Sequence, residues 1–205
     1  MIAGLAADPR DKVGILFYQA TITMLPDVES HAPKLVFAGP TGAGKTTAIA
    51  SVADVPPVST EMPLTSGAMG EKTLTTVAFD FASVRLDGSE TLMLYGLPGQ
   101  EHFEFMRPIV LAGALGTILV LNGADADLAA QCAHWMRAIR DVDERMPVVV
   151  GVTQTENNPS FDIAVVRGVL RAQNATAPVF TFDARDKAQT SQLIRALLLQ
   201  LDDGP

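Results

Sequence analysis

In this chain of 205 residues, the segment KLVFAGPTGAGKTT, residues 34–47, gives the strongest indication of the fold. Its first five residues, Lys34 to Ala38, are mostly apolar and predict a buried strand, and residues from Lys45 to about Ala53 predict a helix. Between them lie a glycine, four residues and Gly-Lys-Thr, which is the spacing of a phosphate-binding loop. Because the loop follows a strand and opens a helix, the sequence predicts a site for a nucleoside triphosphate.

Each residue type in this loop has a role in holding phosphate. Glycines let the backbone turn so that successive N–H groups point at phosphate oxygens, and the helix adds the positive end of its dipole. Lys45 is expected to reach the β and γ phosphates, and the hydroxyl of Thr46 to bind Mg2+. The residues expected to contact the nucleotide here are Gly39, Thr41, Gly42, Ala43, Gly44, Lys45, Thr46 and Thr47.

The composition narrows the class of partner and the compartment. The chain has 23 acidic against 15 basic residues, a formal charge of −8, which argues against nucleic acid or an anionic membrane as the main partner. Its single cysteine, Cys132, allows no internal disulfide and favours a reducing, cytoplasmic setting. Since no apolar run reaches the ~18 residues that span a bilayer, we expect no direct membrane anchor.

Short apolar runs alternate with helical patterns from residue 34 to the end. This order predicts an α/β fold of three layers: a mainly parallel, six-stranded sheet with one antiparallel strand and helices on both faces. Asp87-Gly88 separates two strand-like runs and predicts a hairpin. The expected strands are 34–38, 77–86, 91–95, 116–121, 148–152 and 179–182, and the expected helices are 45–53, 101–112, 128–144, 162–172 and 187–201.

Two regions give no clear periodicity. Residues 54–75 are rich in Pro, Ser, Thr and Gly and predict a long loop that is functional or mobile. Residues 1–33 form an N-terminal extension, separate from the domain at 34–205. Within it, Val13 to Met24 is compatible with an added edge strand, a short helix or a mobile arm, and an edge strand would cover an otherwise open sheet edge.

Three further segments carry a resemblance to a known family: Phe79-Asp80-Phe81, the run from Tyr95 to Gln100, and Asp183-Ala184-Arg185. With the phosphate loop and the order of elements, they resemble the Ras-like small GTPases over about residues 34–202. Within that superfamily the chain is most similar to bacterial MglA-type GTPases associated with Roadblock-domain proteins. The resemblance implies a switch that binds GTP and GDP with Mg2+, hydrolyses GTP and has a Roadblock-domain partner.

The resemblance also implies roles for residues near the γ-phosphate. Thr76 corresponds to the switch I threonine that binds magnesium and senses the γ-phosphate, with the adjacent Thr75 as the other choice. Gly99 corresponds to the switch II glycine whose N–H meets the γ-phosphate, and Gln100 to the glutamine that orients the attacking water. Gln100, Lys45 and Thr76 are therefore the expected catalytic residues.

Two loops are implied to read the base. The run Thr153-Gln154-Thr155-Glu156 stands where the family has Asn-Lys-x-Asp, so Thr153 aligns with the asparagine and Glu156 with the base-reading acid. Asp183-Ala184-Arg185 resembles the Ser-Ala-Lys loop, in which the alanine N–H meets the guanine oxygen. Together they favour guanine over adenine.

Near the magnesium and the γ-phosphate, the chain departs from the family pattern at two more places. Gly96 stands where an aspartate usually holds magnesium through water, and MglA-type proteins also lack that aspartate. Asp80 is either a replacement for it or a solvated strand residue. Thr75 occupies the place of the MglA arginine; Lys72, Arg85 and Arg107 are nearby in sequence, although Arg107 also reads as a solvated charge. We therefore expect slow hydrolysis that a partner accelerates.

Two other functions remain open at this point. One is a P-loop ATPase or kinase, although no arginine cluster typical of a lid is evident. The other is a guanine-nucleotide-binding scaffold that does not hydrolyse GTP, which Gly96 and the missing arginine make reasonable.

Overall fold

The computed structural model of the protein describes residues 32–66, 73–86 and 90–202. The chain divides into two units, Met1–Ala32 and Pro33–Pro205, and all described elements belong to the second. The extension predicted for residues 1–33 lies almost entirely outside the described residues.

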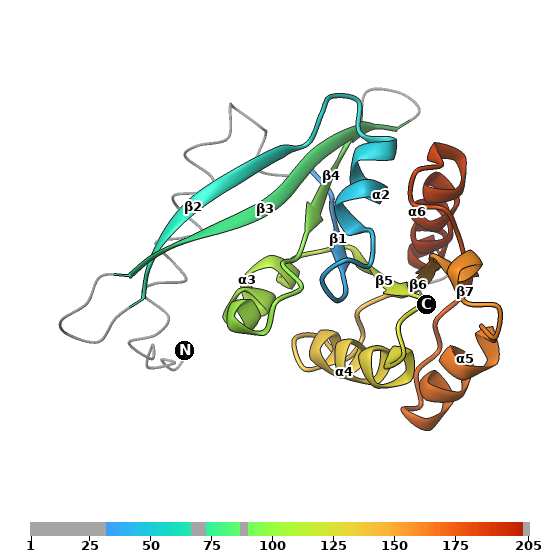
Figure 1. Ribbon diagram of the computed structural model, residues 1–205. Helices are drawn as coiled ribbons and strands as arrows, with labels where there is room; N and C mark the ends of the chain where they lie inside the picture. The colour runs from blue at the N-terminus through green and yellow to red at the C-terminus, as the bar shows by residue number, and fades with distance from the viewer. Residues whose placement is uncertain (1–31, 67–72, 87–89, 203–205) are drawn as a thin grey trace, which may run out of the picture. The chain divides into compact units, whose positions relative to one another are not determined.

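A seven-stranded sheet forms the middle layer, with the order β2-β3-β4-β1-β5-β6-β7 (Figure 1). β3 runs antiparallel to both of its neighbours, and the other neighbouring pairs are parallel. The six predicted strands are all present, and β3 is the antiparallel strand that the hairpin prediction requires. The strands are β1 (Lys34–Ala38), β2 (Val58–Ser66), β3 (Thr73–Arg85), β4 (Thr91–Gly96), β5 (Gly116–Asn122), β6 (Val148–Thr153) and β7 (Val179–Thr181).

The seventh strand, β2, corrects the prediction of a long loop at residues 54–75. Val58 to Ser66 pair with β3 in continuous antiparallel register, from Val58 opposite Phe81 to Ser66 opposite Thr73. Backbone pairing at a sheet edge needs neither an apolar run nor alternation, so the composition of the segment did not reveal it. An edge strand also tolerates Pro63, because one side of the strand needs no hydrogen-bond donors.

Helices cover both faces of the sheet (Figure 1). α2 (Lys45–Val52) and α6 (Lys187–Asp202) pack on the face that holds Leu35 and Phe37 of β1. α3 (Arg107–Leu111), α4 (Leu128–Arg140) and α5 (Ile163–Ala172) pack on the face that holds Val36 and Ala38. The central strands are therefore mostly apolar, as expected for strands covered on both sides.

The helix predicted over 101–112 is divided in two. Residues Glu101–Met106 form a 3-10 helix, η1, and the α-helix α3 covers only Arg107–Leu111. Pro108 has no backbone N–H to donate to Glu104, so the α-helical hydrogen-bond ladder does not continue through this point. Within the described part of the chain, no helix has the length and apolar character needed to cross a membrane.

Candidate functional site

The phosphate-binding loop connects β1 to α2 at the carboxyl end of the strand. Gly39, Gly42 and Gly44 all have positive φ angles, of 135°, 78° and 100°. At Gly39 a side chain is also excluded by space, because a Cβ there would lie 2.0 Å from the carbonyl oxygen of Val120. The backbone path of the loop thus depends on glycine, as the motif predicts.

Lys45 lies inside the loop. Its Nζ donates to the carbonyl oxygens of Gly39, at 2.9 Å, and Pro40, at 2.7 Å, and the residue is only 8% exposed. Burial lowers the pKa of Lys45 to about 8, and the nearby carboxylate of Asp80 opposes that shift. The ammonium group is held where phosphate oxygens could replace the two carbonyl groups as its partners.

Asp80 lies beside the next residue of the loop, Thr46. The Thr46 hydroxyl donates to Asp80 Oδ2. In the sheet register Asp80 of β3 stands opposite Gly96 of β4, and a Cβ on Gly96 would lie 2.9 Å from Asp80 Cβ and 3.1 Å from its Oδ2. Asp80 thus occupies the space into which a side chain at position 96 would project. It is half-buried there, so its carboxylate is partly solvated while it contacts Thr46.

This hydroxyl and carboxylate pair fits a magnesium ion. Mg2+ prefers oxygen ligands and usually takes only one or two from the protein, since waters and substrate phosphates complete its octahedron. The described residues contain no group of three or more His, Cys, Asp or Glu side chains that could hold a metal by themselves. The donor set suits a cation that arrives with a nucleotide.

The turn after β4 lies against the phosphate loop. Leu97 N donates to Phe37 O at 2.8 Å and continues the pairing of β4 with β1. A Cβ on Gly99 would lie 2.3 Å from the backbone nitrogen of Thr41, so Gly99 is in backbone contact with the loop. Gln100 comes next in the chain; it is exposed and directly precedes η1. Both switch II residues predicted from the sequence therefore stand at the phosphate end.

The structure does not bring Thr76 to the same place. Thr76 lies within β3, paired with Pro63, four residues before Asp80. In an extended strand this separation is about 13 Å, at about 3.3 Å per residue. The predicted meeting of Thr46 and Thr76 at one magnesium ion therefore requires the β2–β3 hairpin to rearrange.

The first of the two base loops is tied to the phosphate loop. Thr153 Oγ1 donates to Ala43 O at 2.8 Å, and Gln154 Nε2 donates to Gly42 O at 3.0 Å. Thr153 is 2% exposed, and a Cβ on Gly44 would lie 3.5 Å from its methyl carbon and 3.3 Å from the Ala184 Cβ. The side chains of Thr153 and Gln154 hold the phosphate loop, while Ala184 lies beside Gly44.

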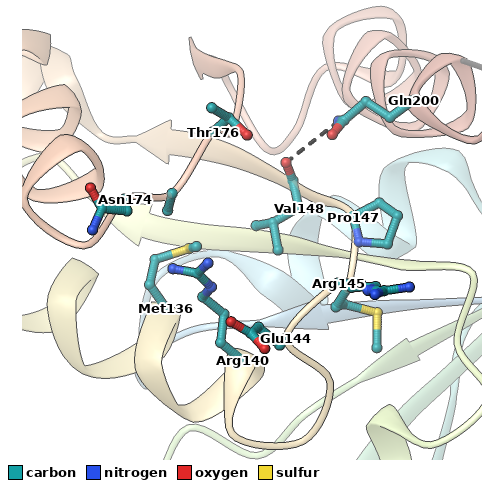
Figure 2. Close-up of a pocket in the computed structure, with 11 residues that line it drawn as sticks. Met136, Arg140, Glu144, Arg145, Pro147, Val148, Asn174, Thr176 and Gln200 are labelled. Carbon is teal, nitrogen blue, oxygen red and sulfur yellow. Dashed lines mark hydrogen bonds between the residues drawn. The ribbon is translucent and has the colours of Figure 1, made fainter. Parts of the chain in front are cut away.

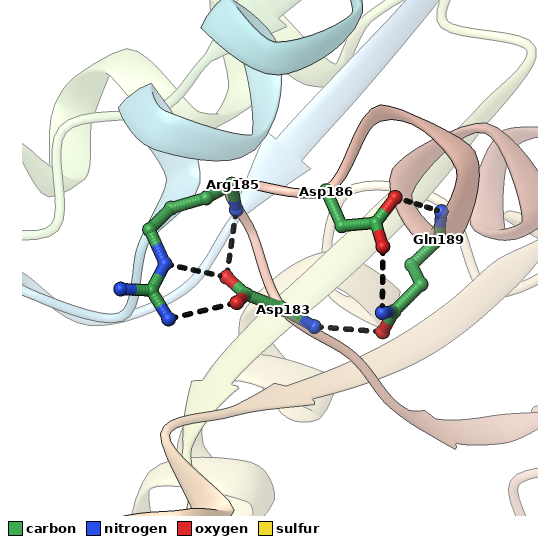
Figure 3. A network of polar contacts seen from close by, with 4 residues as sticks. All are labelled: Asp183, Arg185, Asp186 and Gln189. Atoms are coloured by element: carbon green, nitrogen blue, oxygen red, sulfur yellow. Dashed lines mark hydrogen bonds and ion pairs between the residues drawn. The ribbon is translucent and has the colours of Figure 1, made fainter.

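The second base loop is a compact polar network (Figure 3). Arg185 Nε and Nη2 donate to the two oxygens of Asp183, at 2.8 and 2.7 Å. These bonds hold the pKa of Asp183 at about 2. The bond to Asp183 chiefly raises the pKa of Arg185, and the carboxylate of Glu156 adds to that shift, so Glu156 and Arg185 are electrostatic neighbours.

One part of this network was not predicted. Asp186 accepts from the backbone nitrogens of Ala188 and Gln189, and the Gln189 side chain bonds both Asp186 Oδ2 and the nitrogen of Asp183 (Figure 3). Asp186 followed by Gln189 has the spacing of a capping box, a signal present in the sequence. It fixes the Asp183 loop to the start of α6.

The arginines that were nearby in sequence lie in different environments. Arg107 is buried at 8% exposure, and its guanidinium lies over the ring of Trp135 at 4.4 Å, so the interpretation of Arg107 as a solvated charge is wrong. Arg85 pairs with Thr91, at the far end of β4 from Gly96. Lys72 lies outside the described residues.

A cavity of about 310 Å³ lies away from this site (Figure 2). Its lining includes Val148, the first residue of β6, whereas the last residue, Thr153, contacts the phosphate loop. The cavity is therefore at the opposite end of the strand, and the candidate nucleotide site is the loop surface described above.

The comparison with known families agrees with this geometry. Residues 34–156 match the family described as "Ras of Complex, Roc, domain of DAPkinase". No curated protein matches the chain. Since the family match covers more than half of the 205 residues, from β1 through the first base loop, the chain belongs to the Roc family of Ras-like, GTP-binding GTPase domains.

Proposed function

We propose that the protein is a molecular switch that binds magnesium-GTP and hydrolyses it slowly to GDP and phosphate. The observation that carries the proposal is the position of the phosphate loop between two groups of contacts. Gly99 packs against the loop from one side, and Thr153 and Gln154 hold it from the other. A nucleotide on this loop would have switch II at its γ-phosphate and the base loops at its other end.

The loop amides and Lys45 would grip the phosphates. Lys45 exchanges its bonds with Gly39 O and Pro40 O for bonds with phosphate oxygens, which carry full negative charge and so bind an ammonium group more strongly. The gain is greatest in this buried position, where the charged amine is otherwise poorly solvated.

Thr46 and Asp80 would hold the magnesium ion, with Asp80 acting in place of an aspartate at position 96. When bound, magnesium would neutralise charge on the β and γ phosphate oxygens. Thr76 is proposed to join this site when GTP is bound, after the hairpin rearranges.

Hydrolysis would proceed by in-line attack of water on the γ-phosphorus. Gln100 orients a water molecule whose oxygen forms a bond to the γ-phosphorus. The bond from that phosphorus to the bridging oxygen breaks, GDP leaves with the electron pair, and the water proton passes to the released phosphate. No arginine of the described residues is assigned to this step, and an arginine from a partner would raise the rate by roughly 10³ to 10⁵.

Base selection is assigned to Glu156 and Ala184. A carboxylate at Glu156 accepts two hydrogen bonds from the guanine edge, which adenine cannot supply in the same pattern. The amide of Ala184 donates to the guanine oxygen. Arg185, held by Asp183 beside Glu156, supports the arrangement by keeping the loop in place.

Replacement of Gln100 tests the catalytic part. We expect Gln100→Leu to reduce single-turnover GTP hydrolysis by roughly 10²-fold or more while the GTP dissociation constant changes less than about threefold. Gln192→Leu, at an exposed position of α6, is the matched control and should leave both unchanged. If Gln100→Leu hydrolyses GTP at the wild-type rate, the assignment of Gln100 is wrong.

The bound nucleotide distinguishes the alternatives. The protein is denatured, and the released nucleotide is identified by ion-exchange chromatography. Guanine nucleotide supports the proposal, whereas adenine nucleotide would favour a P-loop ATPase or kinase. Guanine nucleotide without any measurable wild-type hydrolysis would favour the non-hydrolysing scaffold.

We also propose that the switch is of the bacterial MglA type, regulated by a Roadblock-domain protein. The basis is the Phe79–Phe81 and Tyr95–Gln100 segments and the glycine at position 96. Co-purification of a Roadblock-domain protein with the GTP-bound form, but not with the GDP-bound form, would support it. Equal retention by both forms would argue against a regulated partner.

A further inference from the structure

The segment that carries switch II has a buried charge, Arg107. This residue lies where η1 ends and α3 begins, and its side chain is 10% exposed. A buried guanidinium is unfavourable unless polar or aromatic partners surround it. The partners of Arg107 therefore show what holds this segment in place.

Those partners come from two elements. Nη2 of Arg107 lies 3.2 Å from Glu104 Oε1 on η1 and 3.2 Å from His134 Nε2 on α4. The guanidinium carbon lies 4.4 Å from the centre of the Trp135 ring, which is itself 2% exposed in the core. The rings of His134 and Trp135 are perpendicular, with 5.9 Å between their centroids. Arg107 thus connects the switch II segment to α4, whose Trp135 is part of the core.

The segment needs such a connection because its own helical structure is weak. η1 is a six-residue 3-10 helix, α3 has only five residues, and Pro108 interrupts the hydrogen bonds between them. Gln100 is the residue immediately before η1, and Gly99 contacts the phosphate loop. The position of Gln100 therefore depends on where η1 and α3 are held.

We propose that Arg107 is a positioning residue for GTP hydrolysis, which holds Gln100 in place by docking the switch II segment on His134 and Trp135. This inference rests on the proposed function. It also makes Trp135, the only tryptophan in the chain, a natural reporter, because movement of switch II would change the charge above its ring.

The test compares three variants with the wild-type protein. Arg107→Met keeps much of the apolar stem and removes the charge. Arg107→Lys keeps the charge and the cation–π contact but not the planar group that contacts Glu104 and His134 together. Arg137→Met, at an exposed position of α4, is the matched control. For each, we would measure the melting temperature, the dissociation constant of labelled GDP, single-turnover GTP hydrolysis, and Trp135 emission with GDP and with a non-hydrolysable GTP analogue.

We expect Arg107→Met to slow hydrolysis roughly 10- to 100-fold, because small displacements of a catalytic group are costly, while GDP affinity stays within about twofold. Arg107→Lys should recover part of the rate. The wild-type difference in Trp135 emission between the two nucleotides should disappear in Arg107→Met. The control should match the wild-type protein in all four measurements.

Two results would overturn the proposal by itself. One is that the Arg107→Met protein is folded, binds GDP and hydrolyses GTP as fast as the wild-type protein. The other is a parallel loss of melting temperature, GDP affinity and hydrolysis, which would indicate a role in stability alone. Absence of hydrolysis in the wild-type protein, by contrast, would overturn the proposed function, and the positioning role with it.

Discussion

The phosphate end and the base end of the candidate site are built differently. At the phosphate end, one continuous loop supplies the glycines, Lys45 and Thr46, and its shape depends on backbone conformation. At the proposed base end there are two separate loops: Thr153 and Gln154 of the first bond the phosphate loop, whereas the second is held by its own Asp183–Arg185 pair. The difference suggests that the phosphate end provides most of the affinity and the base end most of the selectivity.

Loss of Lys45 gives the largest expected effect. Lys45→Ala removes a charged donor to the phosphates. It should weaken the binding of GDP and of ADP by about 3 kcal/mol each, which raises each dissociation constant more than a hundredfold. Titration with both labelled nucleotides measures this. Lys187→Ala, an exposed lysine at the start of α6, serves as control. A loss confined to GDP would break the division between the two ends.

Replacement of Glu156 should change selectivity instead. Glu156→Gln removes a charged acceptor for the guanine edge. It should weaken GDP binding by about 2 kcal/mol, roughly thirtyfold in the dissociation constant, and should change ADP binding little. The ratio of the two dissociation constants is the measurement, and Glu144→Gln is the control at another exposed glutamate. An unchanged ratio would place base reading elsewhere.

Replacement of Asp80 separates the contribution of magnesium from that of the other contacts at the phosphate end. Asp80→Asn keeps the size of the side chain and removes its charge, so the magnesium concentration needed for half-maximal GTP binding should rise about tenfold. Binding without magnesium should not weaken, because a negative charge near the phosphates has been removed. Asp141→Asn, at an exposed site after α4, is the control. Equal loss with and without magnesium would contradict this role.

The pH dependence should also come from the phosphate end. Burial lowers the pKa of Lys45 to about 8 in the free protein, against 10.5 for an ordinary lysine. Above pH 8 most of the Lys45 amines in the free protein are neutral, and each must take up a proton before it can bind phosphate as an ammonium group. GDP affinity should therefore fall about tenfold between pH 7 and pH 9. Between pH 8 and 10.5 the unfolded chain binds more protons than the folded one, so this group makes unfolding less favourable as the pH rises.

Isothermal titration at several pH values measures the binding part, and urea unfolding of the nucleotide-free protein measures the stability part. Lys45→Arg keeps its charge over this range, so any affinity that remains in that variant should be independent of pH. A flat pH profile for the wild-type protein would show that Lys45 stays protonated in the folded chain.

Much of the fold followed from local patterns, and the exceptions have identifiable causes. Apolar runs predicted the six strands, and the helix predicted from residue 162 begins where Asp162 accepts a hydrogen bond from Ala164 N at 2.8 Å. β2 was missed because a strand at a sheet edge is held by backbone pairing that composition does not record. The change from η1 to α3 after Met106 was missed because Pro108 removes a backbone hydrogen bond to Glu104, four residues earlier in the chain.

The phosphate loop could be identified from the residues alone, because its glycines, lysine and threonine lie in one short stretch at a recognisable spacing. Two other contacts became evident from the folded chain: Asp80 lies against Gly96 and Thr46, and Arg107 lies on Trp135. Asp80 and Gly96 are brought together by the antiparallel register of β3 with β4, and Arg107 meets Trp135 through the packing of α3 on α4. Such contacts depend on how whole elements pair and pack, which no local pattern of residues specifies.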